Sequence, residues 1–118
     1  MTWRAVCTLD ELQDDVPLAV DVVTDADEDF ELAIVQHEGE YFAIYNECSH
    51  AKVPLSEGDV EGCAIECYLH GSKFDLRTGA VLNLPATQPV PVYPCRVVGD
   101  DLEVDVDNPL TSAPVPNY

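Results

Sequence analysis

Two short Cys/His pairs constrain this chain more than any other feature of its sequence. His50 follows Cys48 after one residue, His70 follows Cys67 after two, and sixteen residues separate His50 from Cys67. Two sulfur and two nitrogen donors on short loops that come together suit a transition metal. Such a set also suits a four-coordinate zinc ion, although zinc fingers place both cysteines before both histidines.

The charge of the chain restricts its partners. It has 23 Asp and Glu against 5 Lys and Arg, which gives a formal net charge of −18. Nucleic-acid phosphates and anionic lipid surfaces both attract clustered Lys and Arg and repel carboxylates. We therefore expect neither nucleic-acid nor membrane binding. No apolar run reaches the roughly 18 to 20 residues of a spanning helix, and residues 1–4 lead into no apolar signal core, so we expect a cytoplasmic protein.

The number of cysteines favours metal binding over a disulfide framework. The chain has 5 cysteines, an odd number, and no secretory signal precedes them. Cys7, Cys63 and Cys95 have no histidine at a ligand spacing. We expect these three side chains to act as small buried apolar groups rather than as ligands.

Short β-branched and aromatic runs, bounded by Gly, Asp and Asn, predict an all-β fold. The expected strands lie within residues 16–23, 30–37, 41–45, 90–98 and 102–106, and only residues 9–12 could form a helical turn. The glycines between residues 48 and 80 indicate tight turns rather than regular strands. We expect one domain over residues 1–108, an antiparallel β-sandwich base with a smaller subdomain inserted at about residues 47–80. Residues 109–118 are rich in proline and read as a loosely held tail.

The residues around the two pairs resemble the Rieske iron-sulfur proteins, specifically the small soluble Rieske-type ferredoxins. The resemblance covers about residues 34–106. Besides the pairs it includes Pro54-Leu55, Gly58, Gly62, Gly71-Ser72 and Thr78-Gly79. It implies the Rieske fold and one [2Fe-2S] cluster, with Cys48 and Cys67 on one iron and His50 and His70 on the other. It further implies that the inserted subdomain binds the cluster and that backbone amides of residues 50–53 and 70–72 point at its sulfides.

The same resemblance implies a one-electron carrier that is not catalytic alone. Its expected partners are a ferredoxin reductase and a terminal non-haem iron oxygenase of a ring-hydroxylating dioxygenase system, and we expect a monomer. Two alternatives stay open: a Rieske ferredoxin that serves iron-sulfur cluster assembly, and a zinc-binding interaction module without redox chemistry.

Such a ligand set implies a mild reduction potential. With neutral imidazoles the oxidised cluster and its two thiolates carry no net charge, so an electron is added more easily than to an all-cysteine cluster. Rieske centres accordingly span roughly −150 to +300 mV, against about −400 mV for plant-type ferredoxins. High-potential members join their ligand loops by a disulfide and carry a tyrosine that donates to a cluster sulfur. Here Val53 and Leu69 occupy the two cysteine places and Phe74 the tyrosine place, while Ser72 is kept. We expect a potential low within the class.

Three of the five basic residues, Lys52, Lys73 and Arg77, fall within the segment of the two pairs. They suggest a weakly basic rim that would orient a partner during brief encounters. The alternative is that they are ordinary solvated side chains.

Overall fold

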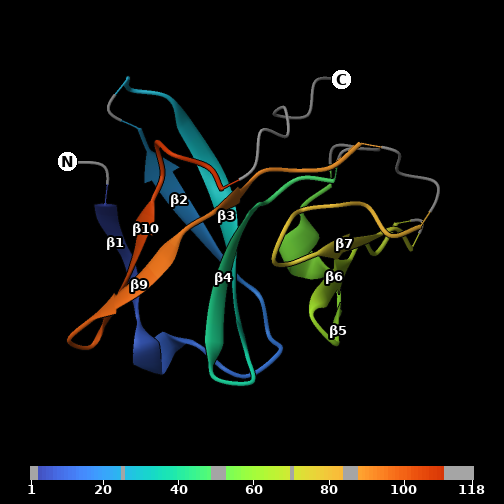
Figure 1. Ribbon diagram of the computed structural model, residues 1–118, viewed down its shortest axis with the longest axis horizontal. Helices are drawn as coiled ribbons and strands as arrows, with labels where there is room; N and C mark the ends of the chain where they lie inside the picture. Colours follow the sequence, from blue (N-terminus) through green and yellow to red (C-terminus); the bar gives the residue numbers. More distant parts are fainter. Residues whose placement is uncertain (1–2, 25, 49–52, 70, 84–87, 111–118) are drawn as a thin grey trace.

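The computed structural model describes residues 3–24, 26–48, 53–69, 71–83 and 88–110. Within these residues the chain forms ten β-strands and two short 3-10 turns and no α-helix (Figure 1). In chain order the elements are β1 (Trp3–Thr8), η1 (Leu9–Glu11), β2 (Leu18–Val23), β3 (Asp29–His37), β4 (Glu40–Tyr45), η2 (Leu55–Glu57), β5 (Val60–Glu61), β6 (Ala64–Glu66), β7 (Lys73–Asp75), β8 (Val92–Tyr93), β9 (Cys95–Val98) and β10 (Asp101–Asp105). This confirms the all-β prediction. In the same residues no helix is long and apolar enough to cross a bilayer.

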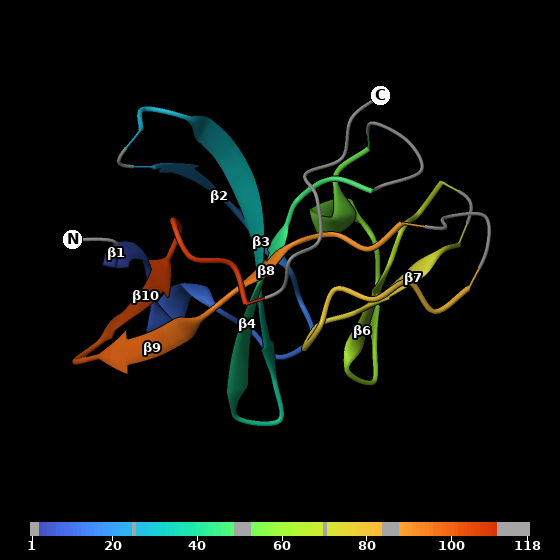
Figure 2. The ribbon, with the colours of Figure 1, turned by 45° about the horizontal axis from the view of Figure 1, so that its top comes forward.

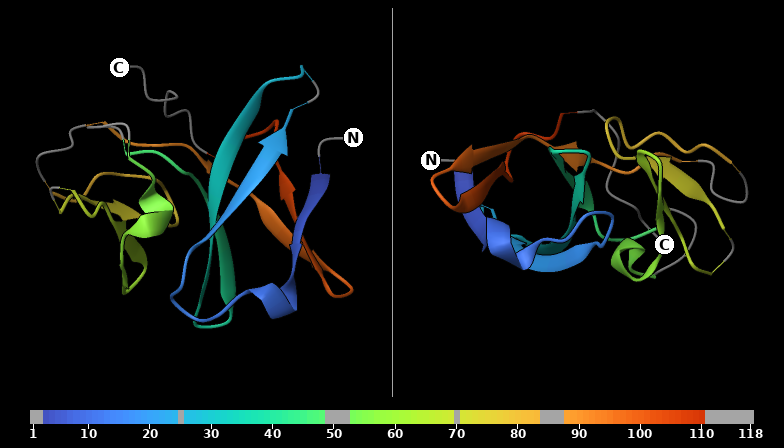
Figure 3. Two further views of the ribbon diagram at one scale, coloured as in Figure 1. Left: turned by 180° about the vertical axis from the view of Figure 1, so that it is seen from behind. Right: turned by 90° about the horizontal axis from the view of Figure 1, so that it is seen from below.

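The strands form three antiparallel sheets arranged as three layers. Their strand orders are β1-β10-β9, β2-β3-β4-β8 and β5-β6-β7. Figure 2 shows the four-stranded sheet in the middle, with the β1-β10-β9 sheet on one side and the β5-β6-β7 sheet on the other. Seen from below, the strands of the first two sheets surround a common interior (Figure 3). These two sheets make up the expected sandwich base.

The middle sheet is shared by two cores. On β3, Leu32 and Ile34 face one core, whereas Ala33 and Val35 face the other, because successive strand residues point to opposite sides. The base core consists of Leu12, Val22, Leu32, Ile34, Ala43, Tyr93, Leu102, Val104 and Val106. The outer core consists of Ala33, Val35, Phe42, Ile44, Cys48, Leu55, Ile65, Cys67, Phe74, Leu76, Val90 and Val92.

Two sequence predictions need correction in the base. The run 90–98 is not one strand: β8 pairs with β4, and β9 pairs with β10, so the chain changes sheets at Pro94. Proline has no N–H to donate to a ladder, and here its carbonyl accepts from Asp105 instead, at 3.1 Å. The N-terminal strand β1, which pairs with β10, was not among the predicted runs. A 3-10 turn, η1, lies within residues 9–12 as the sequence allowed, but a second one, η2 at Leu55–Glu57, was not predicted.

The expectation of turns rather than strands between residues 48 and 80 was wrong in part. β5, β6 and β7 form a small antiparallel sheet there, in which Ile65 lies opposite Val60 on one side and Phe74 on the other. Strands of two or three residues show no alternation that a sequence pattern can reveal. Gly62, at φ +61°, makes the tight turn between β5 and β6.

The C-terminal segment is attached to the base at least as far as Leu110, whose N–H donates to the carbonyl of Val92 at 2.7 Å. The remaining residues of the predicted tail, 111–118, lie outside the described residues.

Candidate metal centre

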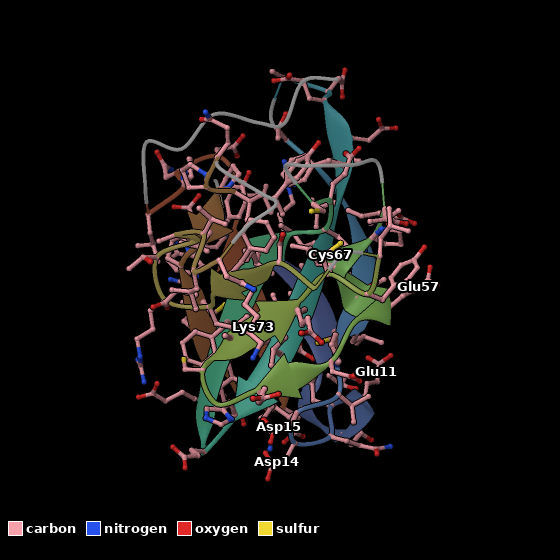
Figure 4. The ribbon with its side chains drawn as sticks, turned by 90° about the vertical axis from the view of Figure 1, so that its right-hand side faces the viewer. Glu11, Asp14, Asp15, Glu57, Cys67 and Lys73 are labelled. Carbon is pink, nitrogen blue, oxygen red and sulfur yellow. The ribbon has the colours of Figure 1, made fainter. Side chains whose placement is uncertain are left out.

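Cys48 and Cys67, the two predicted sulfur ligands, are both buried in the outer core. Their exposed fractions are 0% and 1%, and both belong to the outer core. Cys48 follows the end of β4, and Cys67 follows the end of β6. Figure 4 shows Cys67 near the upper end of the outer layer. The two predicted nitrogen ligands, His50 and His70, lie outside the described residues.

Each of these cysteines opens a turn that its own backbone amide closes. The Cys48 N–H donates to the carbonyl of Val53 at 3.0 Å, and the Cys67 N–H donates to the carbonyl of Ser72 at 2.7 Å. In both turns the bond spans five residues. Gly71 closes the second turn further by donating to the carbonyl of Cys67 at 2.9 Å, with its own φ at +79°, a conformation that suits glycine. We call these segments, residues 48–53 and 67–72, the first and second ligand turns.

This donor set fits an iron-sulfur cluster. All five cysteines fall within the described residues, and none forms a disulfide. Two thiols at the edge of an apolar core would be costly to bury as anions alone, but metal binding stabilises the thiolate form. In the sequence one histidine falls within each of these segments, and two thiolates with two imidazoles would be the donor set of a Rieske-type cluster.

The four positions that the resemblance connects with the reduction potential all lie within the described residues. Phe74 on β7 is fully buried in the outer core and offers no hydrogen-bond donor from its ring, and Ser72, the last residue of the second turn, is also buried. Val53 is half-buried and Leu69 is exposed. Neither residue is a cysteine, so no disulfide can join the two ligand turns at these positions.

The other three cysteines are only partly buried, which corrects the expectation that they are buried. Cys7 and Cys95 pack against the base core and Cys63 against the outer core. Burial raises the pKa of Cys7 to about 11 and that of Cys95 to about 12, and burial is also the main cause that raises the pKa of Cys63. They therefore remain protonated thiols at neutral pH and act as small apolar groups, as the sequence predicts.

The predicted basic rim is neutralised where it can be described. Lys73 Nζ lies 3.3 Å from Glu61 Oε1, and an Arg77 guanidinium nitrogen lies 2.6 Å from Glu40 Oε2. The guanidinium of Arg77 also stacks over the ring of Phe42 at 5.3 Å. Each cation thus has an acidic partner and adds no uncompensated positive charge, while Lys52 lies outside the described residues.

The third histidine, His37, ends β3 opposite Glu40, at the start of β4, whereas Cys48 follows the other end of β4. Its Nδ1 lies 2.6 Å from Asp15 Oδ1, and its Nε2 lies 3.7 Å from Glu38 Oε2. Figure 4 shows Asp15 at the lower end of the molecule, opposite to Cys67. The hydrogen bond to Asp15 is the main cause that raises the pKa of His37 above 6.5. This histidine is part of a surface ion pair and not of the metal centre.

We expect Asp15→Asn to lower the pKa of His37, measured by NMR titration of its ring protons. Because the folded-state pKa is raised, the pair contributes its full stability below about pH 6.5, provided Asp15 is ionised, and loses it as the pH rises through the folded pKa. The difference in melting temperature between the wild-type protein and the variant should therefore be largest at about pH 5 to 6. An equal difference at pH 5 and pH 9 would contradict this.

Residues 2–94 match the family model described as the Rieske [2Fe-2S] domain. The ferredoxin subunit of 3-phenylpropionate/cinnamic acid dioxygenase from Photorhabdus laumondii is 39% identical over 107 residues, which cover 90% of this chain and 96% of that protein. The biphenyl dioxygenase ferredoxin subunit from a Pseudomonas species is 40% identical over 106 residues, covering 89% and 93%.

Solved structures show the same fold. The ferredoxin of carbazole 1,9a-dioxygenase from Nocardioides aromaticivorans superimposes with a TM-score of 0.78 at 38% identity, covering 88% of this chain and 97% of that one. A ferredoxin of carbazole 1,9a-dioxygenase, solved in complex with its oxygenase, gives a TM-score of 0.77 at 28% identity, covering 88% and 93%. A match over so much of the chain, on a fold that solved relatives share, means that this protein belongs to the Rieske [2Fe-2S] domain family and holds one cluster of that type.

Proposed function

We propose that this protein is a cytoplasmic, monomeric one-electron carrier. It receives electrons from a ferredoxin reductase and passes them to a terminal non-haem iron oxygenase, and it is not catalytic alone. The observation that carries the proposal is the pair of equivalent turns, each opened by a buried cysteine. The relatives support the class of partner, because they are ferredoxin subunits of dioxygenases and one neighbour was solved together with an oxygenase.

We propose Cys48, His50, Cys67 and His70 as the cluster ligands, with both cysteines on one iron and both histidines on the other. When bound, the cluster accepts and releases one electron. The two cysteines lie in the outer core and would hold the inner iron away from water. We also propose that residues 47–80 are the cluster-binding subdomain of a single domain over residues 1–108. The support is that the whole β5-β6-β7 sheet is formed within that range.

The surface beside the second ligand turn suits contact with a partner. Tyr68, Leu69 and Leu82 are exposed by 52%, 45% and 55%. Leu82 is held next to the turn, because its N–H donates to the carbonyl of Lys73 at 2.8 Å. Exposed apolar side chains around an electron exit would allow close approach, and short distances favour electron transfer. The neutralised Lys73 leaves this contact mainly apolar.

Purified protein tests the proposal directly. We expect about two irons and two acid-labile sulfides per chain, a red-brown colour that dithionite bleaches, and the EPR signal of mixed Cys/His ligation in the reduced state. With a ferredoxin reductase, NADH and the oxygenase of a biphenyl or phenylpropionate system, substrate hydroxylation should depend on added protein. Colourless, zinc-containing protein, or a Rieske protein that the reductase cannot reduce, would contradict the proposal.

We expect Phe74→Tyr to raise the midpoint potential. The new hydroxyl would add a donor at the place where high-potential members carry one, and a hydrogen bond to a cluster sulfur stabilises the more negative, reduced state. The matched control is Phe42→Tyr, which adds the same hydroxyl to another ring of the outer core. Voltammetry of both variants checks this, and equal potentials for the two would show that the ring edge of residue 74 does not face the cluster.

A further inference from the structure

Each ligand turn is bridged by the side chain of one asparagine that lies outside the turn. These residues are Asn46, two residues before the first turn, and Asn83, in the loop after β7. Neither belongs to the Cys/His motif. Their hydrogen bonds point to a role that the ligands do not explain.

Asn46 connects the start of the first turn to both neighbouring elements. Its side-chain oxygen accepts from the Ser56 N–H at 2.7 Å, and its Nδ2 donates to Ser56 Oγ at 3.0 Å and to Glu31 Oε1 at 3.2 Å. Its backbone N–H also donates to the carbonyl of Glu31 at 3.0 Å. The residue is only 5% exposed. The segment that leads into Cys48 is thereby fixed to β3 before the turn and to η2 after it.

Asn83 holds the second turn from a different part of the chain. Its side-chain oxygen accepts from the Lys73 N–H at 2.6 Å, and its Nδ2 donates to the carbonyl of Gly71 at 3.0 Å. The amide orientation is set by its partners, since a backbone N–H can only donate and a carbonyl can only accept. The two bonds lie on either side of Ser72, whose carbonyl closes the turn onto Cys67.

We propose that Asn46 and Asn83 are positioning residues that fix the two ligand turns and thereby set the reduction potential of the cluster. The inference rests on the proposed ligands. The potential of an iron-sulfur centre depends on hydrogen bonds to its sulfurs and on its exposure to water. A turn that is held at one or both of its ends keeps its backbone amides in place, whereas a released turn would hold these donors less firmly and admit water. The potential of the released form is therefore lower, because the reduced state loses stabilisation.

The experiment compares three alanine variants of the holoprotein. Asn46→Ala and Asn83→Ala each release one turn. Asn108→Ala is the matched control, because Asn108 donates to Asp105 Oδ1 and Oδ2 at 3.1 and 3.0 Å in the base, away from both turns. For each protein we would measure iron content, the midpoint potential by EPR-monitored titration, and the thermal unfolding temperature.

With full iron content, Asn83→Ala and Asn46→Ala should shift the potential to lower values and broaden the EPR lines. Asn108→Ala should keep the wild-type potential and line shape, whatever stability it loses. Asn83→Gln, which keeps both amide groups on a longer side chain, should lie closer to wild type than Asn83→Ala. This order of potentials separates positioning from a general loss of stability.

Wild-type potentials and line shapes in both turn variants would overturn the inference. If Asn46→Ala does not fold, Asn83→Ala decides alone, because Asn83 is exposed and its removal leaves the cores intact. A different result would reject the proposed function, namely the absence of a Rieske EPR signal from the wild-type protein itself. A wild-type signal with unchanged variants rejects only the role of the two asparagines.

Discussion

Serine in place of Cys48 or Cys67 is expected to yield protein without iron, without acid-labile sulfide and without visible absorbance. Each cysteine is completely or almost completely buried in the outer core and would supply one of the two thiolates on the same iron. A serine hydroxyl is a harder donor that stays protonated at neutral pH, so it does not replace a thiolate on iron. With one of only two sulfur ligands lost, the cluster has no stable attachment.

Cys95→Ser is the matched control for both variants. Cys95 packs against the base core, and its thiol donates to the carbonyl of Tyr93 at 3.8 Å, a bond that a serine hydroxyl can also make. This variant should keep the wild-type iron content. Iron, sulfide and visible absorbance, measured after anaerobic reconstitution, check all three proteins. A Cys48→Ser or Cys67→Ser protein with a full cluster would remove that residue from the ligand set.

Gly79→Ala is expected to lower the free energy of unfolding by about 3 to 5 kcal/mol, in the range of the largest single-residue effects. A Cβ at this position would lie 1.9 Å from the carbonyl oxygen of Val90, and the backbone has φ +76°. The backbones of Gly79 and Val90 cannot easily move apart, because the Val90 N–H donates to the carbonyl of Gly79 at 3.0 Å. The Gly79 N–H in turn donates to the carbonyl of Asp75 at 2.7 Å. The bond between Val90 and Gly79 joins the turn after β7 to the segment that leads into β8.

Gly39→Ala is the control that separates the two causes of the lost stability, the clash with Val90 and the left-handed backbone conformation. Gly39 has a similar φ, +79°, but no atom lies within 4 Å of an added Cβ. That variant should lose only the cost of the left-handed conformation, about 1 to 2 kcal/mol. Urea denaturation of the two variants and the wild type measures the difference. Equal losses would mean that the contact with Val90 relaxes freely.

The Cys/His motif and the strands β2, β3, β4 and β10 could be predicted because they rest on local patterns. The spacing of Cys48 and Cys67 with their histidines is visible in the sequence, and β3 and β4 are long enough to show a continuous apolar run. The change of sheet at Pro94 could not be read in the same way. A run of valines that pairs with two different strands looks like one strand until its partners are known.

The surroundings of the site depended on contacts that no local pattern encodes. Lys73 and Arg77 read as a basic rim, yet Glu61 and Glu40 neutralise them from β5 and β4. The bridges of Asn46 and Asn83 likewise join residues ten and twelve positions apart in the chain. An asparagine near a turn is ordinary in a sequence, and only the fold shows which groups its amide reaches.

The alternation of β3 between two cores has a consequence for protein that has lost its metal. Leu32 and Ile34 share the base core with Leu102 and Val104 of β10, whereas Cys48 and Cys67 lie in the outer core, so loss of the cluster would remove contacts on the outer side alone. Most of the strands belong to the two sheets of the base, so the circular dichroism spectrum of the apoprotein would resemble that of the loaded protein. An apoprotein with an intact base can therefore look folded by circular dichroism, and iron content or visible absorbance is needed to show whether the cluster is present.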